Sequence, residues 1–273
     1  MKRILSPAYA LVGHPVLPAD KSIAHRAALF AALAEGTSQI VGYSEAEDPQ
    51  STLNCLRALG IEVEEKDDAL HVHGQGLRGL RAPTDPLDCG NSGTTMRLLA
   101  GILAGQPFAS EMMGDESLSR RPMERIAAPL RQMGADVSLT EGHAPVRING
   151  KKLRGIEYRM PVASAQVKSC VLLAGLYAEG TTTVIETQPS RDHTERMLGL
   201  DAMQLGDERH VSVEGGFSIK PRLWVVPRDF SAAAFFLVAL ATVAALPASW
   251  LRKSVLAAAY GAVAVFVFCS TLK

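Results

Sequence analysis

The segment LRALGIEV at residues 56–63 returns in related form as LRQMGADV at residues 130–137. In each copy an apolar helical pattern ends at a glycine, and an alternating pattern typical of a β-strand follows. A weaker third copy runs from residues 197–199 (MLG) towards the strand-like residues 210–213 (HVSV). The chain therefore repeats a junction between a helix and a strand.

A second feature recurs in phase with this junction. Segments rich in alanine and leucine lead to Gly36, Gly105 and Gly180, and a β-type run follows each glycine. The period of about 70 residues is long for a solenoid, and each period reads helix, strand, helix, strand, strand. We therefore predict three packed mixed α/β (α+β) units around a common core. Chance similarity between Ala- and Leu-rich helices is the alternative, and it does not explain why two features keep the same phase.

The composition limits the classes of function. Lysine plus arginine equals aspartate plus glutamate at 28 each, so no overall field favours nucleic acid or a membrane surface, and anion binding would need a local cluster of cations. The cysteines lie far apart and form no CxxC pair, which argues against a zinc site and a disulfide framework. The first residues do not resemble a secretory signal. We expect the body of the chain to be cytoplasmic.

The C-terminal part changes character. Residues 230–251 and residues 254–272 contain no charged side chain, and only Arg252 and Lys253 separate them. At about 20 residues each, both stretches are long enough to span a bilayer, which would tether the chain to a membrane. The alternative is one ordinary buried helix over residues 230–240, followed by an unrelated hydrophobic tail.

The three predicted first helices open in a similar way. Each begins with small or polar residues and places a cation in its first two turns: ADKSIAHR at 19–26, GNSGTTMR at 90–97 and SAQVKS at 164–169. A helix N-terminus offers free N–H groups and the positive end of a dipole, which favour phosphate or carboxylate. Three such ends converging would form an anion-binding surface.

Two further segments add cations. The run SRRPM at residues 119–123 places arginines before a helix that Pro122 can start, and SRDHTE at residues 190–195 has a capping-box pattern from Asp192 to Glu195. Taken alone, each motif is more often a helix cap or a solvated surface group than a binding site. His25 and His193 are expected to be packing or hydrogen-bonding residues. Together the motifs predict cations without a covalent nucleophile, suited to ligands with several phosphate or carboxylate groups.

In this order the segments resemble the enolpyruvyl transferase family, and in detail its shikimate branch. The resemblance implies two similar domains, each of three βαβαββ units, that close on the substrates. It implies transfer of the enolpyruvyl group of phosphoenolpyruvate to the 5-hydroxyl of shikimate 3-phosphate, with release of phosphate, on the route to chorismate and the aromatic amino acids. No metal or organic cofactor is expected. The UDP-N-acetylglucosamine branch usually has Lys-Asn in place of Lys21-Ser22 and a loop with a reactive cysteine, which no segment here resembles.

The resemblance also implies roles for individual residues. Lys21 would contact both ligands and be the catalytic residue. Shikimate 3-phosphate would be held by Lys21, Ser22, Arg26, Ser164, Ala165, Gln166 and Ser190. Phosphoenolpyruvate would be held by Lys21, Asn91, Gly93, Arg97 and Arg121, because bidentate arginine contacts suit phosphate and carboxylate.

The family pattern predicts the domain organisation and also shows where this chain departs from it. Residues 1–20 would belong to an incomplete second domain, residues 21–227 would form the three-repeat domain, and residues 228–273 would be a remnant helix with a foreign apolar tail. Ala19 and Arg228 stand where the family has glycine. Since the acid/base carboxylates belong to the second domain, we expect little or no turnover by this chain alone. A non-catalytic shikimate 3-phosphate-binding domain and a membrane-tethered remnant remain the alternatives.

Overall fold

The computed structural model describes residues 16–244, which divide into two compact units. One unit spans Ala19–Pro227. The described part of the other consists of residues 16–18 and 228–244.

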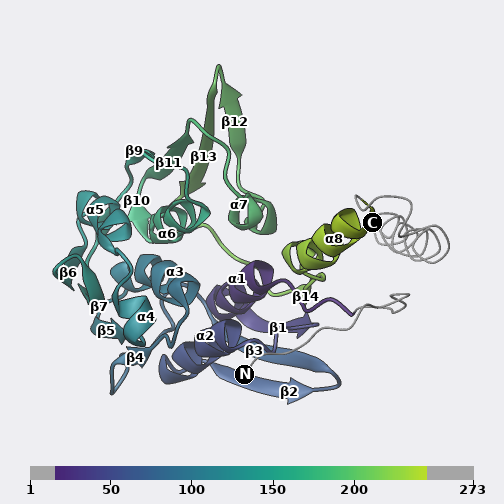
Figure 1. Ribbon diagram of the computed structural model, residues 1–273. Coiled ribbons are helices and arrows are strands. Elements are labelled where there is room, and N and C mark those ends of the chain that lie inside the picture. Colours follow the sequence, from purple (N-terminus) through teal and green to yellow (C-terminus); the bar gives the residue numbers. More distant parts are fainter. Residues whose placement is uncertain (1–15, 245–273) are drawn as a thin grey trace. The chain divides into compact units, whose positions relative to one another are not determined.

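The unit Ala19–Pro227 repeats one order of elements three times (Figure 1). The first repeat contains α1 (Lys21–Leu33), β1 (Glu35–Val41), α2 (Glu47–Ala58), β2 (Glu62–Lys66) and β3 (Ala69–Gln75). The second contains α3 (Gly93–Ala104), β5 (Ala109–Met113), α4 (Glu116–Ser119), α5 (Glu124–Gln132), β6 (Asp136–Thr140) and β7 (His143–Asn149). The third contains α6 (Ala165–Gly175), β11 (Thr181–Glu186), α7 (His193–Leu198), β12 (Ala202–Leu205) and β13 (Glu208–Glu214). The predicted mixed α/β fold of three helix–strand–helix–strand–strand units is confirmed.

Each repeat forms a four-stranded sheet with the same pairing. The first strand of the repeat pairs antiparallel with the last and parallel with a further strand: β4 (Leu87–Asp88) beside β5, and β9 (Glu157–Arg159) beside β11. For the first repeat this parallel partner is β14 (Leu223–Val225), which pairs with β1. The end of the unit therefore completes its beginning, and each repeat becomes a βαβαββ unit. A small separate sheet joins β8 (Leu153–Arg154) to β10 (Ala178–Glu179).

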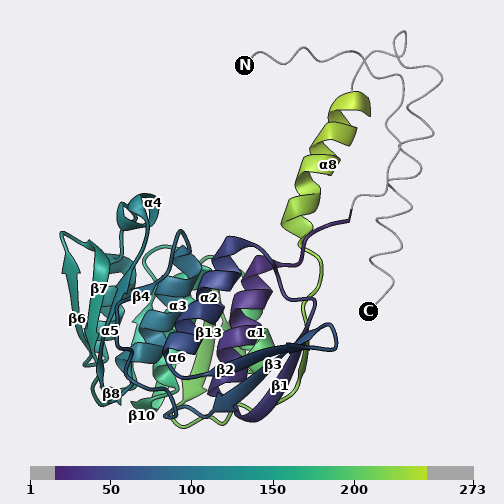
Figure 2. The same cartoon turned by 90° about the horizontal axis from the view of Figure 1, so that it is seen from below.

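The first helices of the three repeats lie at the centre, with the sheets around them (Figure 2). Every residue of α1 from Ala24 to Leu33 is buried, and α3 and α6 are buried along most of their length. A helix buried on all sides is expected to be apolar all round rather than amphipathic. Small buried side chains such as Ala27, Ala28 and Ala31 on α1 let its neighbours approach closely.

A threefold feature that the sequence interpretation missed brings the end of each repeat's last strand against the backbone within or just after the repeat's first helix. A Cβ atom on Gly74 would lie 2.2 Å from the carbonyl oxygen of Ala31, one on Gly150 would lie 1.8 Å from that of Gln106, and one on Gly215 would lie 1.7 Å from that of Ala178. Only glycine fits at these three positions, which lie in β3 and directly after β7 and β13, because a Cβ atom would collide with the carbonyl oxygen.

The sequence pattern placed Gly105 in the same repeat position as Gly36 and Gly180, but its backbone conformation differs from theirs. Gly36 and Gly180 have positive φ angles, whereas Gly105 caps α3 with φ −96°.

The second unit contains α8 (Phe230–Ala244), which includes the predicted helix over residues 230–240. Asp229 N donates to the carbonyl oxygen of Pro18 at 2.8 Å, and Arg228 Nη1 donates to that of Leu17 at 3.1 Å. Arg228 is not among the non-glycine residues with a positive φ, so no left-handed conformation requires a glycine at this position. Within residues 16–244 no helix is both long and apolar enough to cross a membrane. Most of the predicted membrane hairpin lies outside the described residues.

Candidate functional site

The N-terminal ends of the three central helices converge, as predicted. Arg97 on α3 donates from Nη1 to Oε1 of Gln166 on α6 at 2.7 Å, and Arg26 on α1 donates from Nη2 to Oγ of Ser169 on α6 at 2.7 Å. Each helix also has a side-chain cap, formed by Asp20, Ser92 or Ser164. The predicted ligand residue Ser164 thus caps α6, accepting from Val167 N at 3.4 Å, and Ala165 is the first residue of that helix. The site is built from two clusters of side chains around these helix ends.

The first group, which we call the α3–α6 cluster, consists of Asn91, Gly93, Arg97, Arg121 and Gln166. Asn91 Oδ1 accepts from Arg121 Nη2 at 2.6 Å. Gln166 accepts from Arg97 and donates from Nε2 to Oγ1 of Thr94 at 2.9 Å. The predicted phosphoenolpyruvate residues other than Lys21 are therefore linked by hydrogen bonds or contact one another, and Gln166 joins them.

Two guanidinium groups of this cluster converge on one backbone position. A Cβ atom on Gly93, the first residue of α3, would lie 2.8 Å from Arg97 Nη1 and 3.2 Å from Arg121 Nη1. Burial lowers the pKa of Arg97, and the nearby charges of Arg121 and Arg125 lower it further. Like charges are held together here next to a helix N-terminus, an arrangement that an anion would stabilise.

The second group, which we call the α1–α7 cluster, consists of Lys21, Ser22, Arg26, Ser169 and Thr194. The Arg26 side chain is buried, and its Nε donates to Thr194 Oγ1 at 2.8 Å. Its Nη2 donates to Ser169, and its Nη1 donates to the carbonyl oxygen of Ser22 at 2.9 Å. Burial is the main reason why the pKa of Arg26 falls to about 10. Three of the five N–H donors of this guanidinium are thus used inside the protein.

Lys21 and Ser22 lie at the more open edge of the same cluster. Lys21 Nζ pairs with Oδ2 of Asp48 at 3.0 Å, and about half of the Lys21 side chain is exposed, at 49%. Ser22 Oγ accepts from Arg191 Nη1 at 3.2 Å. The ammonium group of Lys21 can therefore turn towards a ligand without leaving a buried position.

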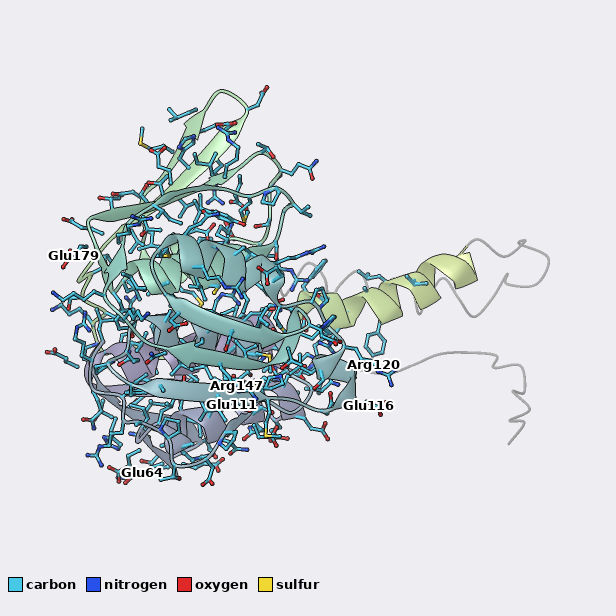
Figure 3. The ribbon with its side chains drawn as sticks, turned by 90° about the vertical axis from the view of Figure 1, so that its left-hand side faces the viewer. Glu64, Glu111, Glu116, Arg120, Arg147 and Glu179 are labelled. Atoms are coloured by element: carbon cyan, nitrogen blue, oxygen red, sulfur yellow. The ribbon has the colours of Figure 1, made fainter. Side chains whose placement is uncertain are left out.

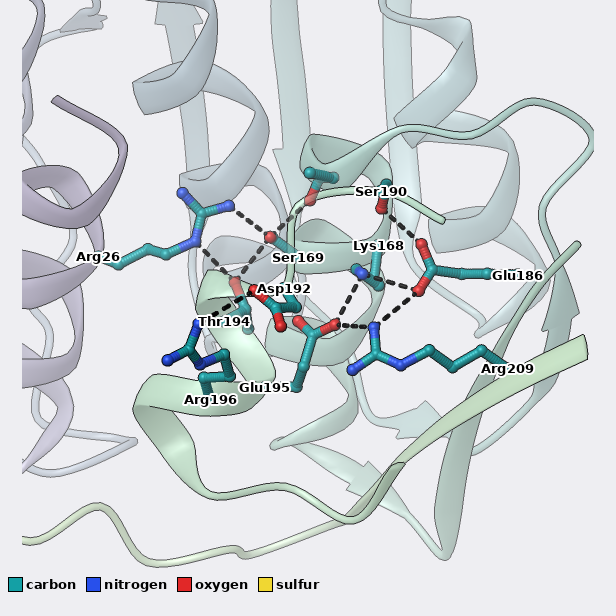
Figure 4. Close-up of polar contacts among 11 residues, drawn as sticks. Arg26, Lys168, Ser169, Glu186, Ser190, Asp192, Thr194, Glu195, Arg196 and Arg209 are labelled. Carbon is teal, nitrogen blue, oxygen red and sulfur yellow. Dashed lines mark hydrogen bonds and ion pairs between the residues drawn. The ribbon is translucent and has the colours of Figure 1, made fainter. Parts of the chain in front are cut away.

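Ser190 is placed differently from the other predicted ligand residues. Its hydroxyl donates to Glu186 Oε1 at 2.5 Å (Figure 4). Glu186 in turn belongs to a buried ion cluster with Lys168, Glu195 and Arg209. In the described part of the chain no side-chain hydrogen bond joins Ser190 directly to the α3–α6 or α1–α7 cluster.

The predicted capping box at α7 is wrong. Asp192 is the N-cap residue but makes no side-chain capping hydrogen bond. Glu195 turns inward, where Oε1 accepts from Lys168 Nζ at 2.7 Å and from Arg209 Nη1 at 2.9 Å. A buried cation on another helix thus attracts the carboxylate more strongly than its own helix terminus does.

Sequence reasoning also missed residues that support the site. Asp115 accepts from Asn91 Nδ2 at 2.7 Å and caps α4 through Leu118 N at 2.7 Å, and the hydrogen bond from Asn91 is the main reason why the pKa of Asp115 is lowered. The aspartate three residues before Leu118 is a helix-start signal that could have indicated this cap. Thr94, Ser169 and Thr194 carry no such signal, because their partners are distant in sequence.

A chain of hydrogen bonds connects α1, α2 and α3 behind the site. His25 Nδ1 bonds Thr52 Oγ1 at 2.7 Å, Thr52 bonds Thr95 Oγ1 at 2.7 Å, and Thr95 donates to Ser92 Oγ at 2.8 Å. Burial lowers the pKa of His25 to about 3, with Arg26 as the next cause. His25 is therefore neutral near pH 7 and joins helices through hydrogen bonds, as expected from the sequence. Residues 16–244 contain no group of three or more His, Cys, Asp or Glu side chains that could hold a metal ion.

Comparisons with known proteins show the family. Residues 6–245 match the family described as EPSP synthase (3-phosphoshikimate 1-carboxyvinyltransferase). The chain is 59% identical over 243 residues to the 3-phosphoshikimate 1-carboxyvinyltransferase of Salinibacter ruber, covering 88% of this chain and 56% of that protein. It is 52% identical over 239 residues to the protein of the same name from Acidithiobacillus ferrooxidans, covering 86% of this chain and 55% of that protein.

Solved structures give the same result. An EPSP synthase from Acinetobacter baumannii superposes with a TM-score of 0.77 at 50% sequence identity, covering 84% of this chain and 53% of that chain. The chain thus spans about half the length of the relatives that it matches. The chain belongs to the EPSP synthase (3-phosphoshikimate 1-carboxyvinyltransferase) family, and its residues 6–245 match the family.

Proposed function

We propose that this chain provides the shikimate 3-phosphate-binding half of an enolpyruvyl transferase, together with part of the phosphoenolpyruvate site. The reaction would transfer the enolpyruvyl group of phosphoenolpyruvate to the 5-hydroxyl of shikimate 3-phosphate and release phosphate, in aromatic amino acid biosynthesis. The observation that carries the proposal is the convergence of Arg97 and Arg121 on Gly93, at the N-terminus of α3. This convergence needs an anion to balance it, and both proposed substrates are anions.

The α3–α6 cluster would hold phosphoenolpyruvate. Arg97 and Arg121 would bind its carboxylate and phosphate groups, since planar guanidinium groups donate two parallel hydrogen bonds to such anions. Gly93 lets the two guanidinium groups come close to the first turn of α3, where the ligand would bind, and Asn91 borders this place while holding Arg121. Fixed donors of this kind stabilise the charge of the tetrahedral adduct through which the family's reaction passes.

The ends of α1 and α6 would hold shikimate 3-phosphate through Ser22, Arg26, Ser164, Ala165 and Gln166, with Ser190 from the segment before α7. Arg26 has two N–H donors left after its three internal hydrogen bonds, enough for one carboxylate or phosphate edge. Lys21 would leave Asp48 and contact both ligands as the catalytic residue, with its ammonium group stabilising the negative charge that both bring.

The domain boundaries are part of the proposal. Residues 21–227 would form the ligand-binding domain, and residues 1–20 and 228–273 would belong to the second domain and its tail. The compact unit Ala19–Pro227, which contains every residue proposed to contact a ligand, supports this division. We also propose a cytoplasmic location, on the composition and the small anionic ligands.

A second candidate function is binding without turnover. It is favoured because the proposed shikimate 3-phosphate residues all lie within one compact unit, whereas the family's acid/base carboxylates are expected in the other domain. Binding is therefore the property to measure first, and phosphate release in the presence of both substrates distinguishes the two candidates.

The test is calorimetric titration of the full chain with shikimate 3-phosphate. We expect saturable binding, about tenfold weaker in Lys21→Ala, because one charge-assisted contact is lost. Lys152→Ala is the matched control, since this exposed lysine lies outside both clusters and should leave the affinity unchanged. A folded wild-type chain that does not bind, or binds as well without Lys21, would contradict the proposal.

A further inference from the structure

Four charged side chains form a buried cluster between α6, β11, α7 and β13 (Figure 4). Lys168 Nζ donates to Glu186 Oε2 at 2.8 Å and to Glu195 Oε1 at 2.7 Å. Arg209 Nη1 reaches the same two oxygens at 3.4 and 2.9 Å. The Lys168 and Glu186 side chains are 0% exposed, that of Glu195 is 2% exposed, and only Arg209 reaches solvent. Two cations balance two anions in this interior position.

Stability alone does not account for such a cluster. Removing charges from water costs several kcal/mol per ion, and apolar replacements of buried ion pairs are often neutral or stabilising. Glu195 Oε2 is buried without a hydrogen-bond partner, so Lys168 and Arg209 hold this carboxylate through its other oxygen. What the cluster provides is a fixed spacing between the elements that carry the charges.

That spacing determines where the segment at residues 187–192 begins and ends. Glu186 is the last residue of β11, and Glu195 lies in the first turn of α7. The ammonium group of Lys168 therefore joins both ends of the segment. Within it, Ser190 donates to Glu186, and Arg191 donates to Ser22 on α1.

The same spacing controls the neighbouring hydrogen bonds of Arg26. Ser169 follows Lys168 on α6, and Thr194 precedes Glu195 on α7. Their hydroxyl oxygens lie 2.7 Å apart, and each accepts a hydrogen bond from the Arg26 guanidinium. A shift of α7 relative to α6 would break the ionic contacts and the Arg26 contacts together.

We infer that Lys168 is a positioning residue for the shikimate 3-phosphate site. Its ammonium group holds Glu186 and Glu195 at one spacing and so fixes Ser190, Arg191 and the guanidinium group of Arg26. The identity of the ligand rests on the proposed function. The positioning itself is a property of the chain without ligand.

The first variant to test is Lys168→Met, which keeps the length of the side chain and removes its charge. The ¹H–¹⁵N signal of the Arg26 Nε–H group, assigned by its loss in Arg26→Lys, reports on the hydrogen bond to Thr194. We expect its solvent exchange to be about tenfold faster in the variant, and shikimate 3-phosphate binding to be about tenfold weaker. Residues in one network of hydrogen bonds and ion pairs commonly have interaction energies large enough for an effect of this size. Lys152→Met is the matched control for loss of a lysine charge at the surface.

A second variant separates positioning from stability. Lys168→Met leaves two buried carboxylates with one cation, whereas Lys168→Met/Glu195→Gln restores charge balance through Arg209 and Glu186. We expect the double variant to regain thermal stability while Arg26 exchange stays fast and binding stays weak. It also carries the test if the single variant does not fold.

The outcomes distinguish this inference from the proposed function. If the double variant regains slow Arg26 exchange and ligand affinity together with stability, or if Lys168→Met changes neither, Lys168 is not a positioning residue. If the wild-type chain does not bind shikimate 3-phosphate, the proposed function fails. The Arg26 exchange measurement still decides the positioning role in that case.

Discussion

Two arginines that the sequence assigns to similar tasks are used differently in the structure. Arg97, in the α3–α6 cluster, faces the like charge of Arg121 across Gly93. Arg26, in the α1–α7 cluster, is 3% exposed and donates three hydrogen bonds to the protein itself. Similar motifs at helix N-termini can therefore place an arginine beside another cation, or anchor an arginine through hydrogen bonds within the fold.

The surroundings explain the difference. Near Arg97 the next charges are those of Arg121 and Arg125, which lower its pKa further. Near Arg26 the charges of Glu195 and Asp20 act in the opposite direction and favour its protonated form. Positive charge is therefore less balanced around Arg97 than around Arg26, so an added anion would change the charge balance more at Arg97.

Replacing the two arginines should show the largest contrast. Arg26→Met leaves Ser169, Thr194 and a carbonyl oxygen without their donor, and we expect it to lower the free energy of unfolding by about 3 kcal/mol. Arg97→Met removes one of two facing cations and should lower it by less than about 1 kcal/mol. Urea denaturation at neutral pH measures both. Equal losses of unfolding free energy in the two variants would contradict the different roles assigned to Arg26 and Arg97.

Acidification should lower the stability of the fold through His25. The pKa of His25 is about 3 in the folded chain and 6.5 for an unperturbed histidine, so between these values the unfolded chain binds the extra proton. Stability is therefore lost as the pH falls below 6.5, by about 2 kcal/mol from this group at pH 5. Urea denaturation at pH 7.5 and pH 5 measures the loss.

The corresponding variant isolates the contribution of His25. His25→Gln cannot take up this proton, so most of the pH dependence should disappear, whatever its effect at pH 7.5. Partly exposed His143→Gln is the control and should keep the wild-type slope. An unchanged slope in His25→Gln would show that other groups cause the loss.

Gly93→Ala sharpens the account of the α3–α6 cluster. The new Cβ would require Arg97 Nη1 to move from its position 2.8 Å away. We expect phosphoenolpyruvate binding to weaken about tenfold, equal to about 1.4 kcal/mol, with a smaller change in stability. Gly142→Ala, whose Cβ would meet nothing within 4 Å, is a control for adding a methyl group, although its positive φ adds strain. Unchanged affinity in Gly93→Ala would place the ligand elsewhere.

A surface pair should show the smallest effect and sets the scale for the buried cluster. Arg147 on β7 and Glu111 on β5 are cross-strand partners that point towards each other on the outer face of their sheet (Figure 3), with Nε 2.9 Å from Oε2. Arg147→Gln should lower the free energy of unfolding by less than about 1 kcal/mol. A loss as large as that of Arg26→Met would contradict the view that burial decides the difference.

Much of the fold could be predicted from local sequence patterns. The repeats at residues 56–63 and 130–137 gave the order of elements, because helix ends and alternating strands are local signals. The convergence of the helix starts followed from the repeat. The pairing of β14 with β1 and the need for Gly74, Gly150 and Gly215 could not be predicted, because both depend on backbone segments distant in sequence.

The candidate site shows the same limit. The helix caps of Ser92 and Ser164 were readable, since a cap and its N–H group are three residues apart. Glu195 was misread because its partner Lys168 lies on another helix. The burial of Arg26 could not be predicted either, because its hydrogen-bond partner Thr194 belongs to a different repeat. Which charges lie near solvent and which face each other is decided by packing.

One measurement tests the central contrast most directly. The ¹H–¹⁵N signals of the Gly93 amide, Arg97 Nε–H and Arg26 Nε–H are followed while phosphoenolpyruvate is added to the full chain. We predict that the Gly93 and Arg97 signals shift and saturate together, while the Arg26 signal stays in place. A shift of Arg26 without a shift of Gly93 and Arg97 would contradict this prediction.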